Sequence, residues 1–176
     1  MQENQLIKQV LQGKASAQEA FYRQFAPKMY AVCVRFARDR DEANDILQEG
    51  FIKVFSNLKS YRGDGSLEGW IRRTIVNTAI NFYKKTLKHR NSADIDTVLI
   101  FEKSTDPTAV EQMSADELMQ HVSHLPQGYR AVFNLNVIEG YTHKEIGEML
   151  NISENTSKSQ LSRARAYLQK RIENKE

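Results

Sequence analysis

YTHKEIGEMLNISENTSKSQLSRARAYLQKR, the stretch from Tyr141 to Arg171, decides the fold of the second half of the chain. Thr142 can cap a helix because its hydroxyl can accept a hydrogen bond from a free amide of the first turn, and Glu145 three residues later completes a capping box. Ser153 is a second suitable N-cap, and the helix that follows it places four small or apolar residues in one stripe: Ser157, Leu161, Ala164 and Leu168. Two short helices joined by a short polar turn predict a helix-turn-helix.

The second of these helices, from 154 to about 171, has the composition of a DNA-contacting element. It carries five cations, Lys158, Arg163, Arg165, Lys170 and Arg171, against Glu154 alone. Short polar side chains that can reach phosphates and base edges lie between them: Asn155, Thr156, Ser159, Gln160 and Ser162. The alternative is a solvated amphipathic helix in an ordinary bundle, but the pattern favours DNA binding.

The composition indicates a soluble helical protein. The chain has 176 residues, 40% of them hydrophobic and 27% charged, with only three prolines and eight glycines. It contains no run approaching the ~20 apolar residues that span a bilayer, and its first residues do not resemble a signal peptide. Cys33, the single cysteine, lies among apolar residues, so we expect a buried thiol and a cytoplasmic protein without membrane insertion.

Charge is strongly segregated along the chain. Residues 59–90 contain eight lysines and arginines against two acidic residues, whereas residues 91–117 contain seven acidic residues against one lysine. The weak net charge of +3 conceals this division. Two basic blocks that flank an acidic one would favour two separate contacts with a polyanion.

Four helices are expected in the first half of the chain. The first spans residues 2–12, the second runs from a Ser16 cap to about residue 37 with Pro27 kinking it, and the third starts at Asp39 or Asp41 and extends to Leu58. The fourth spans residues 67–87. Its inward stripe is expected to consist of Ile71, Ile75, Thr78, Ala79 and Phe82.

A second, outward stripe on the fourth helix is suited to nucleic acid. Trp70, Arg73, Asn77, Asn81, Lys84 and Lys88 follow one another at three or four residues. Amides can contact bases, cations can hold phosphates, and an aromatic ring can stack on an unpaired base. The alternative is a basic solvated face whose tryptophan turns into the core.

The chain is expected to be all-α and to consist of two small helical domains, 1–88 and 114–176, joined by a flexible acidic linker, 89–113, that has no helical periodicity. In the second domain, Ser114 can cap a helix that extends through His121. Leu125 and Pro126 open another helix, with Tyr129, Val132 and Phe133 inward, and Gly140 ends it.

No motif of catalysis is apparent. His121 and His124 lack the further ligands of a metal site, and Gly63 and Gly65 lack the Lys-Ser/Thr ending of a phosphate loop. The sequence therefore predicts a protein that is not an enzyme and has no cofactor or metal.

Both halves resemble one family. The segment from Asp41 to Lys85, DEANDILQEGFIKVFSNLKSYRGDGSLEGWIRRTIVNTAINFYKK, is similar to region two of the extracytoplasmic-function sigma factors of bacterial RNA polymerase. LPQGYRAVFNLNVIEGYTHKEIGEMLNISENTSKSQLSRARAYL, from Leu125 to Leu168, is similar to their region four. The two segments stand in the right order, and the resemblance covers about residues 5–172.

The resemblance implies a subunit that binds core RNA polymerase, through its beta-prime and beta subunits, and recognises promoter DNA. The implied polymerase contact is Asp45, Gln48, Glu49 and Phe51. The implied minus-ten contact, with a base flipped out of the separated non-template strand, is Tyr61, Arg62, Asp64, Trp70, Arg73, Asn77, Asn81, Lys84 and Lys85. The implied minus-thirty-five contact is Thr156, Lys158, Ser159, Gln160, Ser162, Arg163 and Arg165, where Arg165 is expected to grip phosphate. The resemblance implies an anti-sigma factor as a further partner.

The chain departs from the family pattern at three positions. Gly147 replaces a usual alanine, which should loosen the first motif helix slightly. Ser157 and Gln160 replace a common valine and arginine, and the glutamine puts one phosphate or base contact in doubt.

Two other hypotheses stay open from the sequence. A stand-alone helix-turn-helix regulator would bind an operator as a symmetric dimer, without polymerase. A pure interaction module would bind polymerase or an inhibitor without reading the promoter, so substitution of Lys158 or Arg163 would leave promoter-directed transcription unchanged.

Overall fold

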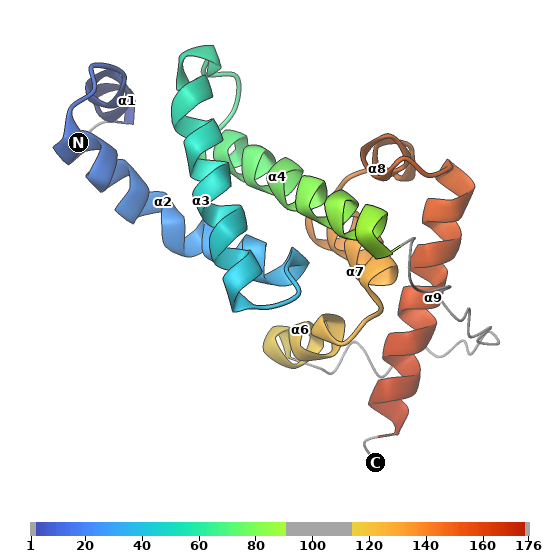
Figure 1. Cartoon of the computed structure of the whole chain (residues 1–176). Helices are drawn as coiled ribbons and strands as arrows, with labels where there is room; N and C mark the ends of the chain where they lie inside the picture. The colour runs from blue at the N-terminus through green and yellow to red at the C-terminus, as the bar shows by residue number, and fades with distance from the viewer. Residues whose placement is uncertain (1–2, 91–113, 175–176) are drawn as a thin grey trace. The chain divides into compact units, whose positions relative to one another are not determined.

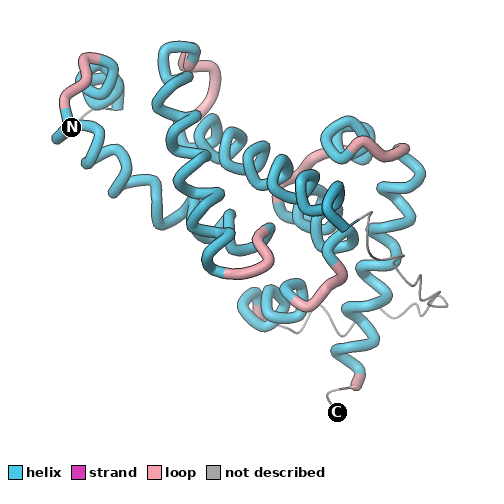
Figure 2. The backbone as a smooth tube through the Cα atoms, in the orientation of Figure 1, coloured by secondary structure: helices cyan, strands magenta, loops and turns pink. Residues whose placement is uncertain are grey.

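The computed structural model describes residues 3–90 and 114–174, and throughout these residues the secondary structure is helical, without strands (Figures 1 and 2). The chain divides into two compact units, with the boundary between Leu87 and Lys88. The two units are described separately below. The expected linker, 89–113, lies outside the described residues except for its first two positions, which continue a helix.

The first unit contains α1 (Glu3–Leu11), α2 (Ala15–Phe36), α3 (Arg40–Asn57), the short 3-10 helix η1 (Leu58–Ser60) and α4 (Leu67–Arg90). The helix expected from Ser16 begins one residue earlier, and its N-cap, Lys14, supplies no side-chain hydrogen bond. The expected Ser16 cap is therefore wrong: Ser16 lies within the helix. Pro27 lies inside a helix that continues on both sides of it.

An aromatic cluster holds α2 against α3. The ring of Phe21 lies 5.0 Å from that of Phe25 and 5.5 Å from that of Phe55, measured between centroids. Phe21 is fully buried. Gly50 of α3 lies directly against the Ile75 side chain of α4. Any larger residue at position 50 would displace the Ile75 side chain.

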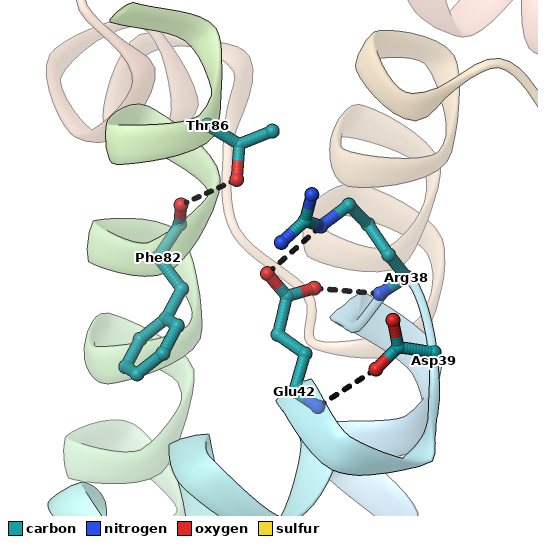
Figure 3. Close-up of polar contacts among 5 residues, drawn as sticks. All are labelled: Arg38, Asp39, Glu42, Phe82 and Thr86. Carbon is teal, nitrogen blue, oxygen red and sulfur yellow. Dashed lines mark hydrogen bonds and ion pairs between the residues drawn. The ribbon is translucent and has the colours of Figure 1, made fainter. Parts of the chain in front are cut away.

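The start of α3 is fixed by a polar network that lies beside α4 in Figure 3. The Asp39 carboxylate accepts a hydrogen bond from the Glu42 amide at 2.8 Å, as the sequence predicts for an N-cap. The carboxylate of Glu42, which is 9% exposed, accepts bonds from the Arg38 amide at 2.6 Å and from Arg38 Nε at 3.0 Å. On α4, Thr86 donates to the carbonyl of Phe82 at 3.1 Å. A nearly buried carboxylate is thus satisfied within its own turn.

The inward face of α4 is wider than the sequence predicts. Ile71, Ile75, Thr78 and Ala79 are buried as expected, but Val76, Ile80 and Tyr83 are buried too. Phe82 is only half-buried, with Lys85 Nζ 5.5 Å from its ring centroid. The expectation that Phe82 points inward is wrong because the buried face is centred on the neighbouring row of residues.

The second unit contains α6 (Ala115–Ser123), α7 (Gln127–Phe133), the π-helical turn η2 (Asn134–Ile138), α8 (His143–Leu150) and α9 (Glu154–Glu173). Ser114 caps α6 in a complete capping box with Glu117. In the core of the unit, α9 packs against α7 and α8. Its buried residues are the predicted Ser157, Leu161, Ala164 and Leu168, together with Gln169.

Candidate nucleic-acid interface

The loop before α4 brings two aromatic side chains, Tyr61 and Trp70, close together. Gly63 and Gly65 have φ angles of 81° and 94°, in the left-handed region that favours glycine. The Tyr61 hydroxyl donates to the carbonyl of Gly65 at 2.8 Å, which closes the loop. The Tyr61 ring lies 5.7 Å from the Trp70 ring at an interplanar angle of 54°, and both side chains are half-buried. The loop therefore holds two adjacent rings at the surface.

The outward stripe of α4 continues from this pair. Arg73, Asn77, Asn81, Lys85 and Lys88 are exposed, and Lys84 is half-exposed. Arg62 and Asp64 in the loop are exposed as well. Rings, amides and cations on one continuous surface can stack on bases, hydrogen-bond their edges and neutralise phosphates.

Lys28 makes a contact with α4 that the sequence did not indicate. Its ammonium lies 2.7 Å from the Glu68 carboxylate, in the first turn of α4, and so connects α2 to the start of that helix. The pair is 40 residues apart in sequence, so no local pattern indicates it.

The helix-turn-helix has the expected caps. The Thr142 hydroxyl accepts from the Glu145 amide at 3.2 Å, and the Glu145 carboxylate accepts from the Thr142 amide at 2.7 Å. Ser153 accepts from the Thr156 amide at 2.9 Å. Between them, Asn151 ends α8 with a left-handed φ of 59°, a conformation that asparagine tolerates.

A hydrogen bond not predicted from the sequence joins the two motif helices. His143 Nδ1 lies 2.8 Å from the hydroxyl of Ser157, which is fully buried. Ser157 is thus a polar contact between α8 and α9. A buried hydroxyl needs such a partner, because burial without one costs about 1–3 kcal/mol.

The solvent-facing side of α9 carries most of the predicted DNA contacts. Lys158, Ser159, Ser162, Arg163 and Arg165 are exposed. Thr156 and Gln160 are half-exposed. The Thr156 hydroxyl lies 2.7 Å from that of Ser153, so it belongs to the cap of α9 as well.

Lys158 forms an ion pair with Glu154, the acidic residue in the first turn of α9. Its ammonium lies 3.0 Å from the Glu154 carboxylate. The hydrogen bond from Lys158 is the main cause that lowers the pKa of Glu154, and the charges of Lys158, His143 and Lys144 lower it further. Glu154 is therefore ionised at neutral pH.

The acidic face of α3 differs from the expectation in one residue. Asp45 and Gln48 are exposed, and Glu49 is half-exposed with its carboxylate 2.7 Å from Lys53 Nζ. Phe51 is instead 3% exposed, with its ring 4.8 Å from that of Tyr22. The assignment of Phe51 to a protein-binding surface is wrong for the structure described, because its side chain fills the core.

Ile52 takes the apolar position on this face. It is 66% exposed, and it follows Asp45, Gln48 and Glu49 at helical spacing. The sequence could have indicated that Ile52 lies on this face, since residues three and four apart share a helical face.

The described residues contain no helix long and apolar enough to cross a membrane. A search of the same residues for three or more clustered His, Cys, Asp or Glu side chains that could hold a metal ion found none.

Comparison with known proteins places both halves in one family. Residues 21–88 match the family model "Sigma-70 region 2", and residues 115–168 match "Sigma-70, region 4". The RNA polymerase sigma-H factor of Pseudomonas aeruginosa is 28% identical, over 98% of this chain and 94% of that protein. The ECF RNA polymerase sigma-E factor of Haemophilus influenzae is 25% identical, over 96% of this chain and 94% of that protein.

The fold is shared with a solved structure, the sigma factor RpoE of Bartonella quintana in complex with the anti-sigma factor NepR. The TM-score is 0.52 at 21% identity, over 86% of this chain and 94% of that one. Two family models in the family's order, and relatives aligned over nearly their whole length, lead to one conclusion: the chain belongs to the sigma-70 family, in its extracytoplasmic-function group.

Proposed function

We propose that this chain is the promoter-specificity subunit of a bacterial RNA polymerase. It binds the core enzyme and directs initiation at promoters whose minus-ten and minus-thirty-five elements it recognises. The observation that carries the proposal is the pair of cationic helical faces, on α4 and α9, in two units that each match a sigma-70 domain. Because sigma factors act on RNA polymerase, we place this activity in the cytoplasm, as promoter recognition and without catalysis by this chain.

The minus-ten function is assigned to the loop 61–66 and to α4. Flipping a base out of the stack costs a few kcal/mol, so a receiving surface must offer stacking and hydrogen bonds in return. Tyr61 and Trp70 supply the rings, and their 5.7 Å separation is set by the closed loop. The exposed amides Asn77 and Asn81 and the cations Lys84 and Lys85 then follow the single strand.

The minus-thirty-five function is assigned to α9. In a helix-turn-helix the second helix lies in the major groove, with its N-terminal residues on the base edges. Lys158, Ser159, Ser162 and Arg163 are exposed on the first half of α9, outside the buried stripe. Arg165, exposed on the next turn, is assigned to phosphate.

The acidic face of α3, defined by Asp45, Gln48, Glu49 and Ile52, is assigned to the core polymerase. It offers carboxylates around an exposed apolar side chain. An apolar centre with a charged rim is a common composition of protein interfaces. An anti-sigma factor is proposed as a further partner, since a protein of this fold was solved with one.

Run-off transcription with purified core polymerase tests the function. The chain is added to core enzyme over a library of genomic fragments, and the transcripts are sequenced. We expect start sites that share two elements, lost when either element is scrambled. A duplex shifted by the chain alone at modest salt, with no effect on core polymerase, would instead support a stand-alone regulator.

A further inference from the structure

The charges of α9 are arranged unevenly. Glu154 is its first residue and Glu173 its last, and every charged residue between them is basic. A helix that served only to attract a polyanion would gain nothing from an acid in the turn that enters the groove. Glu154 therefore needs an explanation that the cationic face does not provide.

Glu154 forms an ion pair with Lys158. Its Oε1 lies 3.0 Å from Lys158 Nζ, and the two side chains are 50% and 55% exposed. Ser157 and Leu161, three and seven residues after Glu154, are buried, so the exposed ion pair lies at the edge of the buried stripe of α9. His143 and Lys144, at the start of α8, are close enough for their charges to lower the pKa of Glu154. The carboxylate is thus ionised and lies at the surface assigned to DNA.

A structural role alone would also be consistent with this geometry. An acid in the first turn of a helix is favourable, and a glutamate four residues before a lysine stabilises an isolated helix. Ser153, however, already caps α9 by accepting from the Thr156 amide. A purely structural role predicts an effect of Glu154 on stability and none on the choice of DNA sequence.

We propose that Glu154 is a specificity-determining residue of α9, whose carboxylate competes with phosphate for Lys158 and accepts a hydrogen bond from a base amino group in the major groove. This inference rests on the function proposed for α9. Contact with phosphate separates Lys158 from Glu154 and leaves a carboxylate beside the DNA polyanion. The non-specific binding of this turn to DNA is therefore weakened.

A matching base pair satisfies both charges together. Lysine donates to the O6 and N7 atoms of guanine, and glutamate accepts from the N4 amino group of cytosine. The Glu154–Lys158 pair therefore matches the edge of a G·C pair or of neighbouring G and C bases. Specificity results from the difference between this site and all others.

Holoenzymes with single substitutions test the proposal on a promoter library whose minus-thirty-five element is randomised. Wild type, Glu154→Gln, Glu154→Ala and Lys158→Ala are compared. Glu173→Gln is the matched control, because it removes the same charge from the other end of α9. Sequenced transcripts give the base preference at each position, and binding to a scrambled promoter is measured across salt concentrations.

We expect Glu154→Ala and Lys158→Ala to relax the preference at the same or adjacent base pairs, by roughly fivefold or more. Glu154→Gln keeps an acceptor, so it should lose less preference. It should nevertheless bind the scrambled promoter more tightly, with a salt dependence steeper by up to about one ion. Glu173→Gln should behave as wild type.

The proposal is overturned if Glu154→Ala keeps the wild-type preference at every position, or if Glu173→Gln relaxes it equally. A change in melting temperature without a change in preference would assign Glu154 to helix stability alone. If wild-type holoenzyme itself shows no minus-thirty-five preference, the function proposed for α9 fails, and this inference fails with it.

Discussion

The expected effect of Gly147 on stability differs between the sequence and the structure. By helix propensity, a glycine inside α8 should weaken that helix relative to alanine. In the structure, a Cβ at Gly147 would lie 2.8 Å from the carbonyl oxygen of Ile152, a backbone atom of the turn. The Ile152 amide donates to the Gly147 carbonyl at 3.0 Å, so helix and turn meet closely at this point. The missing side chain permits this turn.

We therefore expect Gly147→Ala to destabilise the second unit. Strain from the added methyl group, of about 1–3 kcal/mol, should exceed the gain of about 1 kcal/mol in helix propensity. Denaturant unfolding of the full chain measures the difference. Gly69→Ala is the control, since the nearest obstacle there is a side-chain hydroxyl, Ser66 Oγ, at 3.0 Å. A stabilised Gly147→Ala variant would contradict this interpretation.

Cys33 is a core residue, as the sequence predicts. It is fully buried on α2, and burial raises the pKa of its thiol to about 12 from an ordinary value of 9.0. Because the thiolate is the reactive form, Cys33 should be inert in the native state.

A thiol reagent at pH 8 should therefore leave native Cys33 unmodified and label it rapidly in denaturant. The raised pKa also has a consequence for stability. Above pH 9 the unfolded thiol loses its proton while the folded one keeps it, so the contribution of Cys33 to stability falls as the pH rises from about 9 to about 12. Native labelling as fast as in denaturant would show that the first unit opens locally at α2.

The function proposed for α9 divides its DNA contacts into two kinds by position. Lys158 and Arg163 are assigned to base edges, and Arg165 is assigned to phosphate. All three are exposed and lie outside the buried stripe of α9.

Substitution to alanine should distinguish these contacts. Lys158→Ala and Arg163→Ala should each cost roughly 1–3 kcal/mol at the preferred promoter and relax one position. Arg165→Ala should weaken all promoters alike and reduce the salt dependence by about one ion. Holoenzyme binding to promoter variants across salt measures both effects. Equal losses on every sequence for all three variants would reject base readout by α9.

On α4, the tryptophan beside the loop should act after duplex binding. The Trp70 ring lies 5.7 Å from that of Tyr61, tilted by 54°, and we propose that it stacks on an unpaired base, an interaction worth about 1–3 kcal/mol. Trp70→Ala should reduce strand opening more than closed-complex formation, whereas Trp70→Phe should retain part of the opening. Permanganate footprinting reports the opened bases, and filter binding reports the complex. Equal loss in both assays would instead indicate a structural role for Trp70.

For the whole molecule, function depends on a surface that meets the core polymerase. The acidic face of α3 combines the exposed Asp45 and Gln48 with Ile52, while Phe51 lies in the core below. A reversed charge in this face should repel a basic partner surface.

Asp45→Lys should weaken association with core polymerase at least about tenfold, because like charges brought together cost several kcal/mol. Glu19→Lys is the control. It makes the same change at an exposed position of α2, where Glu19 pairs with Arg23. A competition assay against wild-type chain for limiting core enzyme gives the ratio. Equal effects of both variants would remove α3 from the interface.

Local sequence patterns were sufficient to predict most of the helices, the division into two units and the exposure of most candidate site residues. Helical periodicity and caps such as Asp39, Ser114, Thr142 and Ser153 are local properties, so they can be predicted from neighbours in the chain. The buried stripe of α9 and the exposed face of α4 follow from the same spacing.

Local patterns did not predict which residues at the border between two helical faces are buried. Phe51 is buried and Ile52 exposed, and Phe82 is half-buried although Tyr83 is buried. The helical spacing of apolar residues locates a buried face only to within one residue. The packing of neighbouring helices then determines which row of side chains is buried. Contacts between residues distant in sequence, such as Lys28 with Glu68 and His143 with Ser157, depend on how the helices meet, which no local pattern encodes.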